Sequence, residues 1–375
     1  MKTCDFLVVG GGIAGASAAY ELAAGGRVVL LEREDRPGYH SSGRSAAQFI
    51  ETYGNASVRA LTRASRPFYE APPEGFAVQP LLSPRPVLFV ARADQRAALA
   101  AQIAEIGPQA ATLEELDGPE AEALVPVLRP GYAAAAVLEP EASDIDVHAL
   151  HQGYLAGFKR RGGALVLRAE VAGLDRQDGL WQVRAGDESY RAAVVVNAAG
   201  AWGDTLAALA GAAPVGLVPK RRTAVTFDSP AGVEPAPWPL VADVEERFYF
   251  KPEAGRILAS PADETPSPPC DVQPEELDVA VVMDRLAQAT TLAPRSLAHR
   301  WAGLRSFVAD KSLVIGQDDR VEGFFWLVGQ GGYGFQTAPA AARTAAGLLL
   351  EGVLPDDIAA EGVTAAELSP ARLRP

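Results

Sequence analysis

Cysteine and histidine are scarce in this sequence, which limits the kinds of site that it can form. The two cysteines, Cys4 and Cys270, lie far apart and fit no metal-ligand spacing, so we expect free thiols rather than a disulfide. Two of the four histidines, His148 and His151, are close in sequence, but no acid or further histidine at ligand spacing completes a site around them. The sequence therefore predicts no metal centre.

Long apolar runs and an excess of basic charge are also missing. The N-terminal apolar run from Phe6 to Val9 ends at glycines, far short of the length of a secretory signal or a membrane span. A formal net charge of -13 argues against a polyanionic partner, because phosphate binding needs a concentrated basic surface. We therefore expect a cytoplasmic protein with no transmembrane segment and no nucleic-acid partner.

What is present is the composition of a globular protein with more than one core. The 375 residues are 48% hydrophobic and 22% charged, and a chain of this length normally divides into two domains. Two proline-rich stretches, Ser229 to Leu240 and Pro261 to Pro274, lie among strand-like runs such as Thr223 to Phe227 and Arg247 to Lys251. This pattern predicts a β-rich domain with long loops in the second half of the chain.

The N-terminal residues predict a strand, a glycine turn, a helix and a second strand. Phe6 to Val9 is a continuous apolar run, as a parallel strand buried on both faces requires. Ile13 to Ala24 is rich in alanine and stops at Gly25-Gly26, and Arg27 to Glu32 has the pattern of a second buried strand. Together these segments form a βαβ unit of about 30 residues.

The turn of this unit carries the pattern G-x-G-x-x-G as Gly10, Gly12 and Gly15, and Glu32 follows about 20 residues later. Such glycines let a pyrophosphate approach the helix N-terminus, while the acid can bind a ribose hydroxyl pair. An acid at this position favours FAD or NAD over NADP. FAD is favoured over NAD because the motif lies at the extreme N-terminus, and because small hydroxyl-bearing residues from Tyr39 to Ala47 can line an extended diphosphate and a flat ring.

A similar pattern returns later in the chain. Ala192 to Val196 runs into Asn197-Ala198-Ala199-Gly200, and Phe324 to Val328 runs into Gly329-Gln330-Gly331-Gly332. Between the first unit and these segments, Asp146 to Arg161 has a helix-like start and a Gly162-Gly163 stop, which suits a crossover helix. The nucleotide-binding domain is therefore predicted to be discontinuous.

Taken together, these segments resemble the D-amino acid oxidase and glycine oxidase group of flavoenzymes. The motifs that carry the resemblance are GGGIAGAS at the N-terminus, GRSAA, VVVNAAGAW, WAGLRSF and QGGYGFQT. Within the group, the chain is most similar to the D-arginine dehydrogenases, over essentially its whole length. The resemblance implies non-covalent FAD and a fold of α/β plus α+β class. In that fold a Rossmann-like FAD-binding domain (1–80, 145–215 and 300–375) is interleaved with an antiparallel-sheet substrate-binding domain (81–144 and 216–299).

The resemblance also implies which residues contact the cofactor. They lie in the N-terminal unit, in the small-residue segment after it, around the later glycine turns, and at the start of the last helix. That helix is expected to point its N-terminus at the flavin, where it can stabilise negative charge. The expected cofactor residues are Gly10, Gly12, Ile13, Ala14, Gly15, Glu32, Arg33, Ser41, Ser42, Gly43, Arg44, Ser45, Ala46, Ala47, Gln48, Val171, Ala199, Gly200, Trp202, Gly303, Arg305, Gly331, Gly332, Tyr333, Gly334, Phe335, Gln336 and Thr337.

By the same resemblance, Arg222 and Arg305 bind the substrate carboxylate, since a guanidinium pairs with a carboxylate through two hydrogen bonds. Tyr53, on an expected mobile loop from Glu51 to Asn55, and Tyr249 are expected to contact the substrate and close over it. The Gly332 carbonyl and the Gln336 amide are candidate acceptors for the substrate amine. These residues form the expected catalytic site.

The chain departs from the D-arginine dehydrogenase pattern at three positions around the far end of the substrate. Gln48 and Val87 stand where that pattern has a histidine and a carboxylate, and Ile50 replaces a threonine. A buried guanidinium without a carboxylate partner is costly, so D-Arg and D-Lys are not expected to be strongly preferred. The departures predict a less polar pocket that favours apolar or neutral side chains.

The expected reaction is FAD-dependent oxidative deamination of D-amino acids by hydride transfer from Cα to flavin N5. It gives an imino acid, which hydrolyses to a 2-oxo acid and ammonia. An N-methyl amino acid or 2-hydroxy acid oxidoreductase remains an alternative, as does a non-catalytic FAD-binding subunit. The sequence leaves open whether a quinone or O₂ accepts the electrons.

Overall fold

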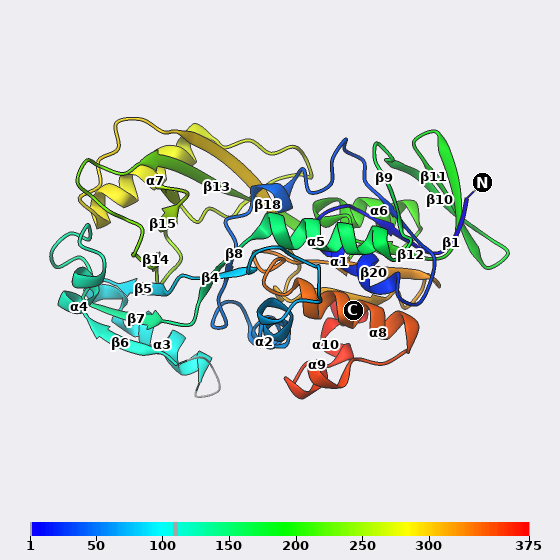
Figure 1. Ribbon diagram of the computed structural model, residues 1–375, viewed down its shortest axis with the longest axis horizontal. Helices are drawn as coiled ribbons and strands as arrows, with labels where there is room; N and C mark the ends of the chain where they lie inside the picture. Colours follow the sequence, from blue (N-terminus) through cyan, green and yellow to red (C-terminus); the bar gives the residue numbers. More distant parts are fainter. Residues whose placement is uncertain (1, 108–111, 375) are drawn as a thin grey trace.

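Two large β-sheets organise the molecule, one at each end of its long axis (Figure 1). The computed structural model describes residues 2–107 and 112–374. The first sheet contains the N-terminal strands, and the second is formed mainly by the middle of the chain. A small three-stranded sheet has the order β3 (Gln48–Phe49), β8 (Ser143–Ile145) and β4 (Leu82–Pro84). This arrangement confirms the predicted fold of a dinucleotide-binding domain interleaved with a second sheet domain.

The first sheet is parallel at its centre. Its central strands are β20 (Phe324–Val328), β12 (Glu188–Asn197), β1 (Lys2–Val9), β2 (Val28–Leu31) and β9 (Ala164–Val166), each parallel to its neighbours in that order. Antiparallel strands extend it: β10 (Val171–Gln177) and β11 (Leu180–Ala185) pair beside the first half of β12, and β19 (Val314–Gln317) pairs with β20. Segments far apart in sequence thus form one sheet, as the recurring pattern predicted.

Successive residues of β1 pack into opposite layers, because side chains alternate across a strand. Phe6 and Val8 belong to the core under α1 (Ile13–Leu22), α5 (Val147–Arg160), α8 (Ala338–Leu350) and α2 (Ala56–Glu70). Leu7 and Val9 face the core that includes α6 (Gly203–Leu209). This double burial explains the continuous apolar run.

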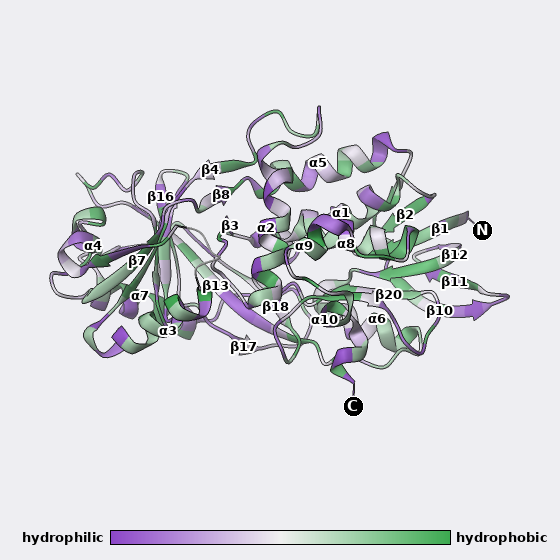
Figure 2. Ribbon diagram, turned by 90° about the horizontal axis from the view of Figure 1, so that it is seen from below, coloured by the Kyte–Doolittle hydropathy of each residue, from purple (hydrophilic) through white to green (hydrophobic). Residues whose placement is uncertain are grey.

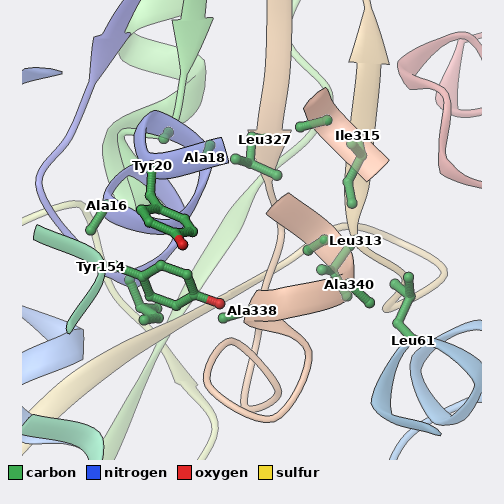
Figure 3. Packing of buried hydrophobic residues seen from close by; sticks show 14 of the residues in the cluster. Ala16, Ala18, Tyr20, Leu61, Tyr154, Leu313, Ile315, Leu327, Ala338 and Ala340 are labelled. Carbon is green, nitrogen blue, oxygen red and sulfur yellow. The ribbon is translucent and has the colours of Figure 1, made fainter. Parts of the chain in front are cut away.

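Small side chains let the helices of the first layer approach closely (Figure 3). Ala16, Ala18 and Tyr20 on α1 lie near Tyr154 on α5 and the alanines of α8. The rings of Tyr20 and Tyr154 meet edge to face, with centroids 5.5 Å apart. The last turns of the chain, α9 (Asp356–Ala360) and α10 (Ala365–Leu368), pack beside this layer, where Ile358 and Leu368 are fully buried.

The second sheet has nine strands and is antiparallel except at one pair. Its order is β17 (Thr265–Pro266), β13 (Val218–Asp228), β16 (Arg256–Ser260), β15 (Tyr249–Glu253), β14 (Leu240–Asp243), β5 (Val87–Ala91), β7 (Ala135–Glu139) and β6 (Glu114–Asp117), with β18 (His299–Phe307) also beside β13. The pair β14 and β5 is parallel, which the prediction of an antiparallel sheet did not include. Among the described residues of this half, the helices are α3 (Arg96–Ile106), α4 (Gly118–Leu124) and α7 (Glu276–Ala289).

The strand β18 pairs with β13 along its whole length, from Val218 opposite Phe307 to Thr226 opposite His299. The predicted boundary between domains at residue 300 therefore lies inside a strand of the second sheet. The prediction placed the WAGLRSF segment in the cofactor domain, which was given the range 300–375. In the structure, β18 is hydrogen-bonded to β13 of the second sheet. Its residues Trp301 and Leu304 also contact the segment that follows β2 in the first domain.

Hydropathy follows this architecture (Figure 2): the central strands of both sheets are hydrophobic, whereas β10 at a sheet edge is largely hydrophilic. Short 3₁₀ turns occur at Ser41–Arg44, Ala93–Gln95, Gly200–Trp202 and Pro370–Leu373. Among the described residues, no helix combines the length and the apolar character that crossing a bilayer requires.

Candidate active site

An elongated cavity runs from the end of β2 toward the second sheet. Its two parts share Gly12, Ser41, Ser42, Ala198, Gly200 and Ala201, so they form one continuous slot. Glu32 and Trp202 line the part near β2, which we call the nucleotide end. Arg222, Arg305 and Tyr53 line the other part, which we call the substrate end.

The glycine turn after β1 is shaped by close backbone contacts. Gly10 has a φ of 112°, and a Cβ there would lie 2.3 Å from the carbonyl oxygen of Ala198. A Cβ at Gly15 would lie 1.8 Å from the carbonyl oxygen of Gly10, so α1 packs directly on the turn. Only glycine satisfies both contacts. The turn thereby brings the N-terminus of α1 to the cavity wall.

Buried side chains hold this turn from behind. The Glu32 carboxylate accepts hydrogen bonds from the amides of Gly11 (2.8 Å) and Glu34 (2.9 Å). His151 on α5 donates from Nε2 to the Gly11 carbonyl oxygen at 2.9 Å. Burial lowers the pKa of His151, so the ring is neutral and carries its proton on Nε2. His151 therefore supports the glycine turn through this hydrogen bond.

The small-residue segment after β2 is fixed to β18. Ser41 donates to the Leu304 carbonyl oxygen at 2.6 Å, and Trp301 donates from its indole to the Arg44 carbonyl oxygen at 3.0 Å. Arg44 donates to the carbonyl oxygens of Val272 (2.9 Å) and Ala302 (3.0 Å), and it pairs with Asp271. Ser42 accepts from the Ile13 amide at 2.9 Å, which satisfies a free N–H group in the first turn of α1. These bonds hold the segment along the cavity.

The glycine run after β20 leaves space for side chains at the substrate end. A Cβ at Gly332 would lie 2.7 Å from Nη1 of Arg305, and a Cβ at Gly331 would lie 2.3 Å from the Phe307 ring. Larger residues at either position would displace these side chains. The run leads into α8, and Thr337, at the N-cap position of that helix, is fully buried.

Arg222 and Arg305 project from the same face of the second sheet. In the β13–β18 register, Lys220 is opposite Arg305 and Arg222 is opposite Gly303. Because directly paired residues share a face and alternate residues of a strand do too, the two arginines are diagonal neighbours. Gly303 presents no side chain between them.

The two guanidinium groups differ in their partners. Arg222 donates from Nε to the Asp263 carbonyl oxygen at 2.9 Å, and its Nη2 lies 3.6 Å from Glu264 without a hydrogen bond. Arg305 donates from Nη1 to the Tyr53 hydroxyl at 3.2 Å, and within the described chain it has no acid within ion-pair distance. Burial raises the pKa of Tyr53, so its hydroxyl keeps its proton. Since that oxygen accepts from Arg305, its proton is free to be donated to a ligand.

The far wall of the substrate end is mainly apolar. It includes Val87, Phe89, Leu240 and Ala242 from neighbouring strands, and Phe248 directly before β15. Ile50 and Tyr249 pack against the same cluster. Glu246, in the turn between β14 and β15, is the acid on this lining, and it is exposed to solvent.

Gln48 is held by a charged cluster beside the cavity. Its Nε2 donates to Asp144 at 3.1 Å, and Asp144 also accepts from Lys251 (2.6 Å) and Arg85 (3.0 Å). Gln336 is similarly fixed, because its Nε2 donates to the Thr62 hydroxyl (2.8 Å) and to the Ile50 carbonyl oxygen (3.3 Å). Its amide nitrogen is thus occupied, which leaves its oxygen as the atom able to accept from a ligand.

Most of the predicted site residues line this one slot, although they come from distant parts of the sequence. Four do not: Gly15 packs α1 on the turn, Gly43 packs over the Gly38 carbonyl, Tyr333 packs edge to face on Tyr53, and Thr337 is the N-cap position of α8. Those that line it are Gly10, Gly12, Ile13, Ala14, Glu32, Arg33, Ser41, Ser42, Arg44, Ser45, Ala46, Ala47, Gln48, Ile50, Tyr53, Val87, Val171, Ala199, Gly200, Trp202, Arg222, Tyr249, Gly303, Arg305, Gly331, Gly332, Gly334, Phe335 and Gln336.

Sequence reasoning missed Phe89, Leu240 and Ala242, which join the cavity from ordinary strand positions, and Glu246 and Phe248, which join it from the turn before β15. No local motif marks them, since they meet only through strand pairing. It also missed the role of His151, which becomes visible only when α5 packs on the glycine turn.

The residues present fit FAD. The slot joins the part lined by Glu32 to the part lined by Arg222 and Arg305, and its middle is lined by glycine, alanine and serine. The N-terminus of α1 opens on that middle part, where a pyrophosphate needs N–H donors. A Cβ at Gly12 would approach the Ser42 hydroxyl to 3.1 Å, so the narrowest part depends on small residues.

Comparison with known proteins gives the same assignment. The family described as FAD dependent oxidoreductase (DAO) matches residues 5–348. The uncharacterized oxidoreductase YurR of Bacillus subtilis is 23% identical over 368 residues, which span 92% of this chain and 95% of YurR. Glycine oxidase from Geobacillus kaustophilus superposes with a TM-score of 0.84 at 20% identity, covering 99% of both chains. Iminodiacetate oxidase from Chelativorans sp. BNC1 gives 0.81 at 23% identity, covering 97% of this chain and 98% of its own.

Proposed function

This chain belongs to the DAO family of FAD dependent oxidoreductases, and we propose that it oxidatively deaminates D-amino acids with apolar or neutral side chains. The cofactor is FAD, and the family includes oxidases and dehydrogenases of amino acids. The D configuration and the side-chain preference belong to the proposal. The D configuration is supported by the motifs that resemble D-arginine dehydrogenases, and the preference by the apolar far wall.

One observation carries the proposal. The Arg305 guanidinium lies at the substrate end with a tyrosine hydroxyl as its hydrogen-bond partner and, within the described residues, no acid in ion-pair range. Burial acts to lower the pKa of Arg305, but the neighbouring Tyr53, Tyr249 and Glu246 raise it further than burial lowers it. The guanidinium therefore stays charged. A desolvated cation of this kind gains most from an anionic ligand. A substrate carboxylate is the simplest such ligand.

The chain's own residues then orient the substrate. Arg305, and the Nη2 of Arg222, bind the carboxylate from one side, while the Tyr53 hydroxyl donates to it from the loop. Because burial raises the pKa of Tyr53, this group donates a proton in a hydrogen bond and does not remove one from the amine. The Gly332 carbonyl and the Gln336 amide oxygen accept from the amine. When bound, FAD supplies the acceptor for the hydride that leaves Cα.

The apolar wall sets the side-chain preference. Val87 is fully buried in the core cluster that also contains Phe89 and Leu240, and Ile50 packs on it. A guanidinium or ammonium placed there would lose its hydration without a partner. Glu246 is the acid on the lining, and it lies at a solvent-exposed turn. Apolar or neutral D-amino acids therefore fit the wall better than D-Arg.

The proposal is tested by mixing the purified holoprotein anaerobically with D-amino acids, L-amino acids, sarcosine and 2-hydroxy acids, and following loss of the oxidised flavin spectrum. Rapid bleaching by D-Leu, D-Met or D-Phe, with D-Arg slower, is expected. Bleaching by sarcosine or hydroxy acids alone would assign the enzyme to the alternative substrate class. If no compound reduces the flavin, the alternative of a non-catalytic FAD-binding subunit replaces the proposal.

A further inference from the structure

A buried carboxyl group that the proposed reaction does not use lies beside the substrate end. Glu139 is the last residue of β7 and is 1% exposed. It pairs in register with Val87 of β5, so both side chains are on the same face of the sheet. Val87 lines the cavity, whereas Glu139 does not. Another segment of the chain therefore separates the Glu139 carboxyl group from the cavity.

The cover is the start of the loop that carries Tyr53. One carboxyl oxygen of Glu139 accepts from the Glu51 amide at 2.8 Å, and the other accepts from the Thr52 hydroxyl. Both donors are themselves buried, with 8% and 5% exposure. They directly precede Tyr53, whose hydroxyl meets Arg305.

Other contacts hold the far end of this loop. Asn55 caps α2 by accepting from the Val58 amide at 3.1 Å, and it donates to the Asp310 carbonyl oxygen at 3.0 Å. Arg59 on α2 donates to the Gly54 carbonyl oxygen at 2.7 Å. Tyr53 thus lies between an end fixed to α2 and an end fixed to Glu139.

We propose that Glu139 is a positioning residue that holds the Tyr53 loop closed over the substrate carboxylate site. Its two acceptor oxygens match the two buried donors of the loop, and removal of the carboxyl group leaves both donors without a partner. An unpartnered buried donor is unfavourable, so the loop then moves toward water and takes Tyr53 away from Arg305. The inference rests on the proposed function only for the identity of the ligand that Tyr53 contacts.

Substitutions at Glu139 separate this role from a general effect on stability. In Glu139→Leu, the dissociation constant for D-Leu, from the concentration dependence of anaerobic flavin bleaching, is expected to rise about ten-fold, with a smaller change in the limiting rate. Glu139→Gln is expected to stay within about three-fold of the wild type, because its amide oxygen accepts from Glu51 and its nitrogen can donate to the Thr52 hydroxyl. In a Tyr53→Phe background, Glu139→Leu should have little further effect, since both changes act on the same contact.

Hydrogen exchange of the holoprotein gives a readout that needs no substrate. Amides 51–55 are expected to exchange faster in Glu139→Leu than in the wild type or Glu139→Gln, with strands β5 and β7 unchanged. Thr52→Val, which removes a single donor, keeps the test decisive if Glu139→Leu fails to fold, and it should raise the dissociation constant for D-Leu about three-fold.

Unchanged binding and exchange in these variants, or effects additive with Tyr53→Phe, would overturn the proposal. If D-Leu reduces no form of the protein, the proposed function fails, while the exchange data still judge the role of Glu139.

Discussion

The nucleotide end and the substrate end of the cavity are built in different ways. The nucleotide end is formed by backbone turns, where Gly10, Gly12 and the amides around Gly11 meet Glu32 within a short stretch of chain. The substrate end is formed by side chains from strands far apart in sequence, such as Val87 on β5, Arg222 on β13 and Arg305 on β18. The glycine turn of the nucleotide end has no room for side chains at Gly10. At the substrate end, a single substitution can change the polarity or charge of the lining.

This difference separates cofactor binding from substrate choice. A backbone turn presents the same N–H groups whatever the substrate, so the nucleotide end can keep its function while the other end varies. At the substrate end, the proposed function has Arg305 and Arg222 binding the carboxylate common to all amino acids, while the residues of the far wall meet the variable side chain. Substitutions in the two regions should therefore fail in different ways.

The largest effect is expected for Arg305→Leu. It removes the cation that faces the substrate carboxylate, so kcat/KM for D-Leu should fall about 1,000-fold, equivalent to about 4 kcal/mol, with FAD still bound. Stopped-flow flavin reduction measures the loss, and the flavin spectrum measures the FAD content. Arg300→Leu on the same strand is the control, because Arg300 is exposed and pairs with Glu276 at the surface. Full activity in Arg305→Leu would contradict the assignment.

Gly10→Ala should break the nucleotide end instead. The added Cβ would lie 2.3 Å from the Ala198 carbonyl oxygen at a φ of 112°, so the turn must shift and FAD affinity should fall at least about 100-fold. Gly255→Ala is the matched control, since Gly255 also has a positive φ of 78° but nothing within 4 Å of its Cβ position. Flavin content after dialysis compares the two. Equal retention of FAD in the two variants would contradict the claim that the close contact at Gly10 excludes a side chain.

The pH dependence of stability tests the burial of Glu139. Burial raises the pKa of Glu139 from 4.5 to about 6, against the two loop hydrogen bonds, which lower it. The protonated form is therefore favoured by folding, so the stability that it provides is complete below pH 4.5 and is lost as the pH rises through about 6. Relative to Glu139→Gln, the wild type should lose about 2 kcal/mol of unfolding free energy between these limits. Urea denaturation of both proteins at several pH values measures it, and a constant difference would contradict the pKa.

The smallest effect is expected for Val87→Glu. A carboxylate at this position provides a partner for a guanidinium, so the preference for D-Arg over D-Leu should rise about ten-fold. Because Glu139 is the cross-strand neighbour of residue 87, repulsion between the two acids limits the gain. Val87→Gln, equal in size but neutral, should leave the preference nearly unchanged. An equal gain in both variants would mean that size or polarity, rather than charge, selects the substrate.

The same contrast explains what the sequence could predict. The βαβ unit, its glycine turn and the strand β20 were predicted close to their observed bounds, except that β1 already begins at Lys2, because their patterns are local and each apolar run is buried on both faces. The place of β18 in the second sheet and the parallel pair of β14 and β5 depend on pairing between distant segments, which local patterns do not encode. For the same reason the apolar wall and the contact between Glu139 and the loop became visible only in the structure.

The central claim is that the substrate end binds a D-amino acid through its carboxylate. The most direct measurement compares anaerobic flavin reduction by D-leucine, L-leucine and 3-methylbutylamine, which is leucine without the carboxylate. The account predicts rapid reduction by D-leucine and little by the other two. Equal reduction by 3-methylbutylamine would contradict the role of Arg305, and faster reduction by L-leucine would contradict the proposed configuration.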